Sequence, residues 1–282
     1  SVPKNAGSMR RIEVQLRENC VAGIPVHPTS CSAATTNIAD RVANAVQAAI
    51  ADIADGFGMA ECGASSPPAV GVISGTDPRN GHRFVNQVFL GRTCGAAGPV
   101  ADAWQTIGHV GNAGMCYIDS VELDELRHPL YLHARGFLAD TEGAGRFNGA
   151  RVGFAIYGPV NCALEVIYNS DGNINGPQGV RGGRDGAGSR QHKLDREGNQ
   201  VAVPQFGRVT LEDGELMCSY SCGGGGYGPP HERTVEAVLH DIAMGFVNRE
   251  RARDIYGVVT DENGRLDEAA TARRREKRAN NH

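Results

Sequence analysis

A glycine-rich loop at residues 91–112 is the first candidate for a site, because it combines flexible backbone with side chains that could act in catalysis. It carries Asp102, His109 and Asn112 among glycines and alanines. An imidazole or a carboxylate beside a reacting group can move a proton or orient a water molecule. We therefore predict Asp102, His109 and Asn112 as catalytic residues. The alternative is a turn-rich connection, in which the histidine caps a strand and Trp104 fills a core.

Two glycine-rich stretches also have the features of an anion site. In the first, the backbone N–H groups of Gly95 and Gly98 can hold a developing oxyanion or a phosphorylated intermediate. In the second, residues 181–189, Arg181 and Arg184 add two positive charges. We predict these four residues as substrate- or anion-binding. A solvated hairpin loop is the alternative for the second stretch.

Other motifs indicate no cofactor on this chain. The GxGxxxG pattern at Gly143–Gly149 precedes an expected strand, whereas a dinucleotide site needs a helix N-terminus there, so we interpret it as a cluster of tight turns. No GxxxxGK[ST] loop occurs. Cys218 and Cys222 lack a second pair to complete a zinc site, so we predict no metal here. Gly223–Gly226 is expected to turn sharply before the prolines that follow.

Composition excludes several classes of protein. With 282 residues, 40% of them hydrophobic, the chain can bury a core, and its net charge of -4 does not favour nucleic acid. No apolar run reaches 18 residues, and the first residues lack the apolar core of a signal peptide. Eight irregularly spaced cysteines suit reduced thiols, so we expect a cytoplasmic protein without a membrane or nucleic-acid partner.

The elements that must position these residues indicate an α+β fold. Residues 11–17 alternate apolar and charged side chains, which predicts a half-exposed strand. The clearest helix covers residues 38–53, with Thr36 or Asn37 as its N-cap and Gly56 as its stop. Its apolar side chains at helical spacing are Ile38, Val42, Val46, Ile50 and Ile53.

The rest of the chain alternates short strands with glycine loops and ends in helices. Strands are expected at residues 83–90, 152–157, 163–168, 208–211 and 216–220, the last two pairing across the turn at Asp213-Gly214. Thr234, Asn248 and Asp267 are expected to begin three C-terminal helices. We predict an α/β region at 1–130, a β-rich region at 131–222 and a helical tail at 223–282.

Several motifs, in this order, carry a family resemblance. The run Gly223-Gly-Gly-Gly-Tyr-Gly-Pro-Pro-His-Glu-Arg233 is followed by Glu236–Asp241, then by Ala252-Arg-Asp-Ile-Tyr-Gly-Val258. Upstream stands the acidic-glycine segment Asp140–Gly149, with Gly149-Ala150 where two glycines are usual. Together they resemble the C-terminal half of the hydantoinase B/5-oxoprolinase family.

The resemblance implies partners and cofactors outside this chain. Members of the family work with a hydantoinase-A-type ATPase subunit, which would bind ATP and magnesium. The residues that hold a divalent metal, zinc or manganese, lie by resemblance in the N-terminal half, so a second chain carrying that half is expected. The resemblance leaves two origins open for this chain, a split subunit and a cleavage product.

The resemblance leaves three functions open. The first is a subunit of an ATP-dependent amidohydrolase acting on hydantoins, oxoproline-like lactams or other cyclic amides. The second is a subunit of an ATP-dependent ketone carboxylase, in which a substrate carbon instead of water attacks the phosphorylated intermediate. The third is a scaffold that joins the ATPase to the metal subunit without taking part in catalysis.

Overall fold

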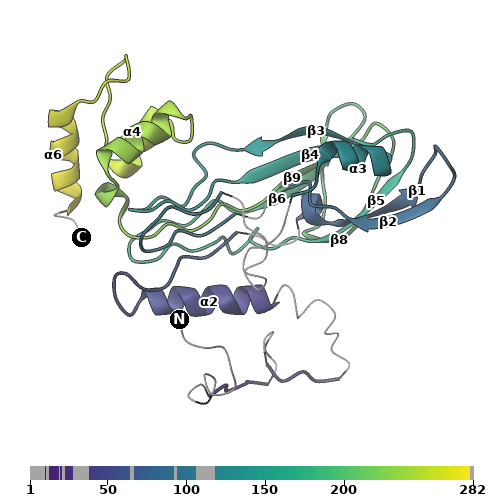
Figure 1. The fold of residues 1–282 in the computed structure, drawn as a ribbon, viewed down its shortest axis with the longest axis horizontal. Helices are drawn as coiled ribbons and strands as arrows, with labels where there is room; N and C mark the ends of the chain where they lie inside the picture. Colours follow the sequence, from purple (N-terminus) through teal and green to yellow (C-terminus); the bar gives the residue numbers. More distant parts are fainter. Residues whose placement is uncertain are drawn as a thin grey trace.

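The α+β prediction is confirmed by the computed structural model, which describes residues 10, 13–18, 20, 23–27, 38–63, 67–91, 94–105 and 118–279. Two antiparallel sheets lie face to face at one end of the molecule, and the C-terminal helices lie at the other end (Figure 1). The first sheet has the order β2-β1-β5-β8, with bounds Arg83–Gln87, Val72–Thr76, Leu164–Asn169 and Phe206–Leu211. The second has the order β3-β4-β9-β6-β7, with bounds Leu130–Phe137, Gly153–Pro159, Leu216–Tyr220, Arg190–Leu194 and Gln200–Ala202.

The main hydrophobic core fills the space between the two sheets. Ile73, Leu164 and Leu211 from the first sheet meet Tyr157 and Met217 from the second, and each of these side chains is fully buried. Alternate residues of a strand face opposite sides, so one face of each sheet supplies the core. The only polar atom that Tyr157 brings into this core is satisfied, because its hydroxyl donates to the carbonyl of Pro68 over 2.7 Å.

One predicted strand pairing is wrong. The expected strands at 208–211 and 216–220 exist as β8 and β9, and Gly214 has the positive φ of a turn. The two strands nevertheless enter different sheets, since β8 pairs with β5 whereas β9 pairs with β4 and β6. The turn therefore connects the two layers of the sandwich instead of closing a hairpin.

Between the sheets and the helical end, the backbones of Gly143, Gly149, Gly183 and Gly186 pack against the run Gly223–Gly226, and these residues are here called the glycine layer. The sharp turn expected at Gly223–Gly226 is wrong: the run is buried and hydrogen-bonded to chain segments around it. The N–H of Gly224 donates to the carbonyl of Ala150 over 2.8 Å, and its own carbonyl accepts the N–H of Gly143 over 2.9 Å. A Cβ on Gly224 would lie 1.7 Å from the carbonyl oxygen of Gly95. Glycine is needed here because backbones touch, not because the chain turns.

The long N-terminal helix is confirmed as α2, Ala39–Ala51, but the expected strand before it is wrong. Residues 13–17 form no strand, and Glu18 makes only an isolated bridge with Ile24. The helix ends with Asp52 as C-cap, before Gly56. The expected N-caps, Thr36 and Asn37, lie outside the described residues.

The predicted helical tail is confirmed, with all three expected caps. Its elements are η4 (Pro230–Glu232), α4 (Val235–Ala243), α5 (Arg249–Arg251), the π-helix η5 (Ala252–Tyr256) and α6 (Glu268–Ala279). The side chains of Thr234, Asn248 and Asp267 accept the N–H groups of Ala237, Arg251 and Ala270 in the first turns. In the described part of the chain, no helix is both long and apolar enough to span a membrane.

A buried carboxyl near the helix α3 (Val121–Arg127) predicts a pH-dependent stability. Burial, the charge of Asp119 and a hydrogen bond to Asp119 raise the pKa of Asp124 to about 6. The ionised carboxyl is disfavoured in the folded state and therefore lowers the free energy of unfolding. This loss is absent below about pH 4 and complete above about pH 6. Asp124→Asn, which keeps a donor for Asp119, should therefore raise the free energy of unfolding at pH 8 by roughly 2 kcal/mol.

Urea unfolding at pH 8 and pH 4.5 measures this effect. The gain from Asp124→Asn should shrink steadily between the two pH values. Glu122→Gln is the matched control on the same helix, because a hydrogen bond from the backbone and another from Ser120 lower the pKa of the exposed Glu122 carboxyl. A gain from Asp124→Asn that is equal at both pH values would contradict this explanation.

Candidate active site

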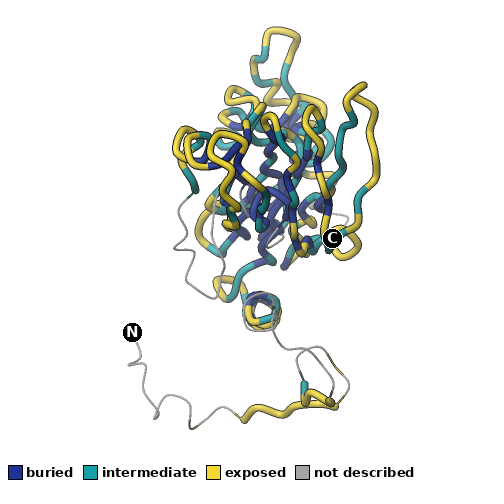
Figure 2. Tube along the Cα trace, turned by 90° about the vertical axis from the view of Figure 1, so that its right-hand side faces the viewer, coloured by how far each residue is buried: buried dark blue, intermediate teal, exposed yellow. Residues whose placement is uncertain are grey.

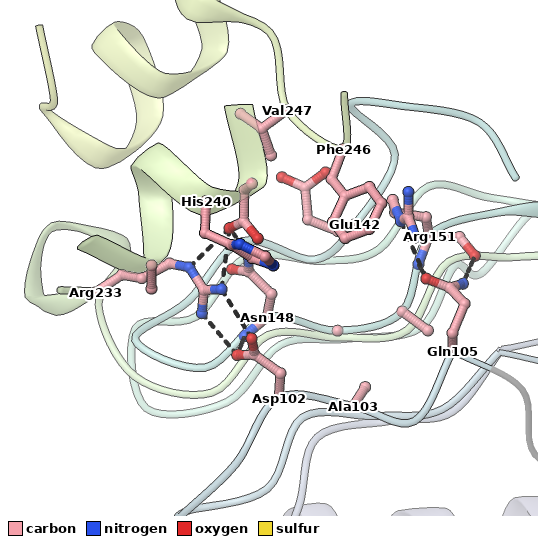
Figure 3. A pocket seen from close by; sticks show the side chains of 14 residues that line it. Asp102, Ala103, Gln105, Glu142, Asn148, Arg151, Arg233, His240, Phe246 and Val247 are labelled. Atoms are coloured by element: carbon pink, nitrogen blue, oxygen red, sulfur yellow. Dashed lines mark hydrogen bonds and ion pairs between the residues drawn. The ribbon is translucent and has the colours of Figure 1, made fainter. Parts of the chain in front are cut away.

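A pocket of about 470 Å³ opens where the glycine layer meets the helical tail (Figure 3). Three segments that are distant in the sequence form its walls: residues 102–105, residues 142–151 and residues 233–247. Its polar lining residues are Asp102, Gln105, Glu142, Asn148, Arg151, Arg233, His240 and Asp241. The lining contains charged, amide and imidazole groups but no serine, threonine or cysteine.

Arg233 ties the three walls together. Its guanidinium makes a two-pronged contact with Asp102, at 2.6 and 2.8 Å, and its Nε donates to Asp241 over 3.0 Å. Arg233 is 4% exposed and Asp241 is 6% exposed, so this ion pair lies almost wholly out of water. Two parallel N–H···O bonds fix the plane of the carboxylate, and Asp102 is thereby held in one orientation at the rim of the pocket.

The charges of this cluster depend on one another. Burial acts to lower the pKa of Arg233, but the hydrogen bond and charge of Asp102 and the charge of Asp241 outweigh it and raise the pKa. Burial raises the pKa of Asp241, and the charge of Arg233 only partly opposes that effect. Arg233 is consequently a permanent cation, and Asp241 needs it in order to stay ionised.

Glu142 offers the pocket a carboxylate oxygen that is unused. Its Oε1 accepts the Nε–H of Arg251 over 2.7 Å and lies 2.8 Å from the hydroxyl of Tyr256. Its Oε2 is buried and has no hydrogen-bond partner among the residues that the structure describes. Buried polar atoms normally have partners, so an unpaired one lining a pocket indicates a place for a ligand donor or a water molecule. Arg251 and Tyr256 fix the carboxylate so that this free oxygen keeps its position.

Arg151 supplies positive charge on the opposite side of the pocket from Arg233 (Figure 3). Its guanidinium carbon lies 3.5 Å from the centroid of the Phe246 ring, and its Nε donates to the side-chain oxygen of Gln105 over 3.0 Å. Burial lowers the pKa of Arg151, while the charges of Asp241 and Glu142 oppose that effect. An arginine packed flat on a ring keeps its edge available for a carbonyl or an anion.

The structure describes only some of the predicted site residues. Asp102 lines the pocket, while His109 and Asn112 lie outside the described residues. The N–H groups of Gly95 and Gly98 donate to the carbonyls of Trp104 and Ala101, each over 3.2 Å. Trp104 is 83% exposed, so the idea that it fills a core is wrong.

The two predicted arginines also lie away from the pocket. Arg181 donates to the carbonyl of Ala51 at the end of α2, over 3.3 Å, and Arg184 is an exposed residue of the same loop. The backbone N–H of Arg184 donates to the carbonyl of Ala144 over 2.7 Å, which fastens this loop to the glycine layer. Whether either side chain binds an anion stays a prediction.

Sequence reasoning assigned no role to four of the residues that build the pocket. Glu142, Arg233, Asp241 and Tyr256 all lie within the motifs that carried the family resemblance. The sequence offered one signal for these residues, namely that charged side chains stand inside glycine-rich or helical motifs. It could not identify which carboxylate meets which arginine, because the partners are separated by up to 131 positions in the chain.

The described residues do not fit a divalent metal. Among them, no three His, Cys, Asp or Glu side chains are grouped so that they could hold an ion. The three carboxylates of the pocket are each bound to an arginine. The described residues are therefore given no metal-dependent role in catalysis.

Comparisons with known proteins agree on one family. The model of the family described as hydantoinase B/oxoprolinase matches residues 1–230. The chain is 32% identical, over 281 residues, to the caprolactamase subunit beta of Pseudomonas jessenii, covering 95% of this chain and 47% of that subunit. It is 27% identical over 211 residues to the acetone carboxylase alpha subunit of Xanthobacter autotrophicus, covering 61% of this chain and 26% of that subunit.

A comparison with solved structures indicates the same family. The crystal structure of the ATP-dependent caprolactamase from Pseudomonas jessenii superimposes with a TM-score of 0.62 at 26% identity, covering 76% of this chain and 38% of that chain. The chain thus spans about half the length of the caprolactamase subunit that it matches. The family model matches most of this chain, and the caprolactamase subunit matches 95% of this chain. The chain therefore belongs to the hydantoinase B/oxoprolinase family.

Proposed function

We propose that this chain is a working part of an ATP-dependent amidohydrolase whose substrate is a cyclic amide. The observation that carries the proposal is its 32% identity to a caprolactamase subunit over 95% of the chain. A hydantoinase-A-type ATPase subunit would bind ATP and magnesium, and the polypeptide that supplies the rest of the hydantoinase-B sequence would hold a divalent metal. The assembly would be cytoplasmic.

The chemistry of the pocket suits an amide. A lactam or hydantoin presents an N–H donor next to a carbonyl acceptor, and phosphorylation adds negative charge at the oxygen. Glu142 Oε2 can accept the N–H, since no donor in the described part of the chain bonds to it. The edge of the Arg151 guanidinium can receive the carbonyl oxygen or its phosphorylated form. Asp102 and His240, at the exposed rim, can exchange protons with water.

A ketone carboxylase is the second candidate. It is supported by the similarity to the acetone carboxylase alpha subunit over 61% of the chain. The two reactions share the ATP-dependent activation and differ in the nucleophile, which is water in one and a substrate carbon in the other. A ketone has no N–H group, so the unpaired oxygen of Glu142 favours the amide.

Substrate-dependent ATP hydrolysis by the assembly purified from its source tests this function. Caprolactam, hydantoins and 5-oxoproline would be compared with acetone and acetophenone, the latter two with bicarbonate. Phosphate release that rises with a cyclic amide and matches the ring-opened product would support the proposal. Turnover only with a ketone and bicarbonate would move the assignment to a carboxylase.

Glu142→Gln should lower kcat/KM for the cyclic amide by on the order of 100-fold in the assembly, because an amide replaces a carboxylate that accepts the substrate N–H. Stability must be measured in parallel, since Arg251 also loses its ion pair. Glu232→Gln is the matched control, because Glu232 lies outside the pocket and pairs only loosely with Arg146, over 3.4 Å. Equal activity of the two folded variants would exclude Glu142 from the site.

The predicted catalytic residues are tested in the same assay. Asp102→Ala, His109→Ala and Asn112→Ala should each lower turnover by roughly 10²–10⁴-fold if they act in acid–base chemistry. A scaffold that only joins two other subunits would keep its turnover within a few-fold in all three variants. Anion binding by Arg181 and Arg184 remains part of this proposal. For Gly95 and Gly98 it would require the N–H groups to leave the carbonyls of Trp104 and Ala101.

A further inference from the structure

Helix α2 turns its apolar face to solvent. Val42, Val46, Ile50 and Ile53 recur every three or four residues and form one stripe along the helix, here called the α2 stripe. Their exposed fractions are 45%, 53%, 38% and 73%. An amphipathic helix at the surface of a complete domain buries this face and exposes its polar one. The opposite arrangement means that the stripe is not part of the core of this chain.

The polar face of α2 fixes the stripe in this orientation. Asp40 and Asn44 are each 2% exposed, and the Asn44 side chain accepts the N–H of Cys62 over 3.1 Å. Arg41 donates to the carbonyl of Gly63 over 3.2 Å and pairs with Asp171 over 3.4 Å. A rotation of α2 that turned the stripe toward the core would break these hydrogen bonds and the ion pair. Figure 2 shows the helix nearly end-on, with exposed residues on its outer side.

Exposed apolar side chains continue along the chain on both sides of the helix. Among the described residues, nine of the 21 large hydrophobic side chains that are exposed fall between residues 13 and 57, including Val14, Leu16 and Phe57. In Figures 1 and 2 the described N-terminal segment lies on the same side of the molecule as α2. Apolar side chains gathered in the open on one side of a protein are typical of an interaction site.

We propose that the α2 stripe binds the polypeptide that supplies the part of a hydantoinase-B-type subunit that this chain does not span. This inference rests on the proposed function in one respect, namely that the chain completes such a subunit. The chain covers 47% of the caprolactamase subunit beta, and the rest of that subunit is a stretch of comparable length. An interface that divides one subunit resembles a domain core cut in half, and a stripe of four aliphatic side chains without a charge has that character.

The test uses the source organism's own polypeptide carrying the remaining hydantoinase-B sequence, produced as a separate chain in the same cells as this one. Size-exclusion chromatography with light scattering gives the mass of the complex, and titration gives its dissociation constant. The triple variant Val42→Ser/Val46→Ser/Ile50→Ser should weaken binding on the order of 100-fold or more. Circular dichroism should find it as folded as the wild type, since all three side chains are exposed.

The matched control replaces Val85, Leu123 and Leu126 with serine, because they are exposed by 73%, 48% and 70% and lie on β2 and α3, away from α2 (Figure 1). This control should bind like the wild type. Hydrogen exchange of residues 38–57 in the wild-type chain gives a second measurement, independent of any variant, and it should slow when the partner is added. Unchanged binding by the α2 variant, or exchange that does not slow, would overturn the proposal.

A second copy of this chain is the other possible occupant. A wild-type homodimer that the α2 variant converts to a monomer, without any added polypeptide, would overturn the proposal in favour of self-association. The outcome is separate from that of the proposed function, because binding is measured without substrate or ATP. A complex that forms through α2 but turns over no cyclic amide would leave this inference standing and contradict the amidohydrolase.

Discussion

Gly224→Ala is expected to abolish folding or to reduce the free energy of unfolding by roughly 4 kcal/mol or more. The added methyl carbon would lie 1.7 Å from the carbonyl oxygen of Gly95, which is backbone and cannot rotate away. The carbonyl of Gly95 is itself bound by the N–H of Ala150 over 3.0 Å, so a shift would also break that bond. Soluble yield, near-ultraviolet circular dichroism and urea unfolding measure the result.

Gly98→Ala is the matched control for this effect. Gly98 lies three residues after Gly95, and the nearest atom to its added Cβ is a carbonyl oxygen 4.0 Å away. Alanine fits there, and since it restricts the unfolded chain, the protein should be unchanged or up to about 1 kcal/mol more stable. If Gly224→Ala unfolds at the same urea concentration as Gly98→Ala, the glycine layer is not packed as described.

Arg233→Met should destabilise the protein by about 3–5 kcal/mol, because it leaves the buried carboxylate of Asp241 without its cation. Asp241 is 6% exposed, and burial already raises its pKa with the arginine in place. Without Arg233 the pKa should rise further. The unfolded carboxyl titrates near pH 4, so the loss should be complete at neutral pH and should shrink as the pH falls toward 5.

Two further variants separate this mechanism from a general loss of packing. The double variant Arg233→Met/Asp241→Asn removes both charges and should recover most of the stability at pH 7. Arg253→Met is the control for losing an arginine, because Arg253 and its partner Asp254 have side chains exposed by 47% and 41%. It should cost less than about 1 kcal/mol. A loss of equal size in the two single variants, independent of pH, would contradict the buried-pair explanation.

The elements with clear local patterns were predictable from the sequence. Thr234, Asn248 and Asp267 each cap a helix as expected, because a cap is a contact within one turn. The strands β4 and β5 also agree with their apolar patterns. The pairing of β8 and β9 did not follow, since the turn at Gly214 is compatible with either a hairpin or a change of sheet.

The function of the glycines and the polarity of α2 could not be predicted. A run of four glycines suggests a turn, whereas here it lets backbones approach one another, and only the surrounding segments reveal this. The spacing of Val42, Val46 and Ile50 correctly predicted a helix. The spacing does not show which face is buried, and in the structure the apolar face is exposed whereas Asp40 and Asn44 on the polar face are buried.

The candidate pocket was predictable only in part. Asp102 was singled out because it stands in a loop with other proton-transferring side chains, and it does line the pocket. Its partner Arg233 lies 131 positions away in the sequence, and no local pattern connects the two. Glu142 is a candidate because its Oε2 has no partner among the described residues. The sequence cannot show this, since it depends on how Arg251 and Tyr256 bind the other carboxylate oxygen.

One measurement tests most directly whether this chain is a working part of an ATP-dependent amidohydrolase. The assembly would be prepared with and without this chain, and ring opening of caprolactam would be followed together with phosphate release. We expect no coupled turnover without the chain, restoration on adding it back, and no restoration by its folded Glu142→Gln variant. Full turnover in the preparation that lacks the chain would contradict the account.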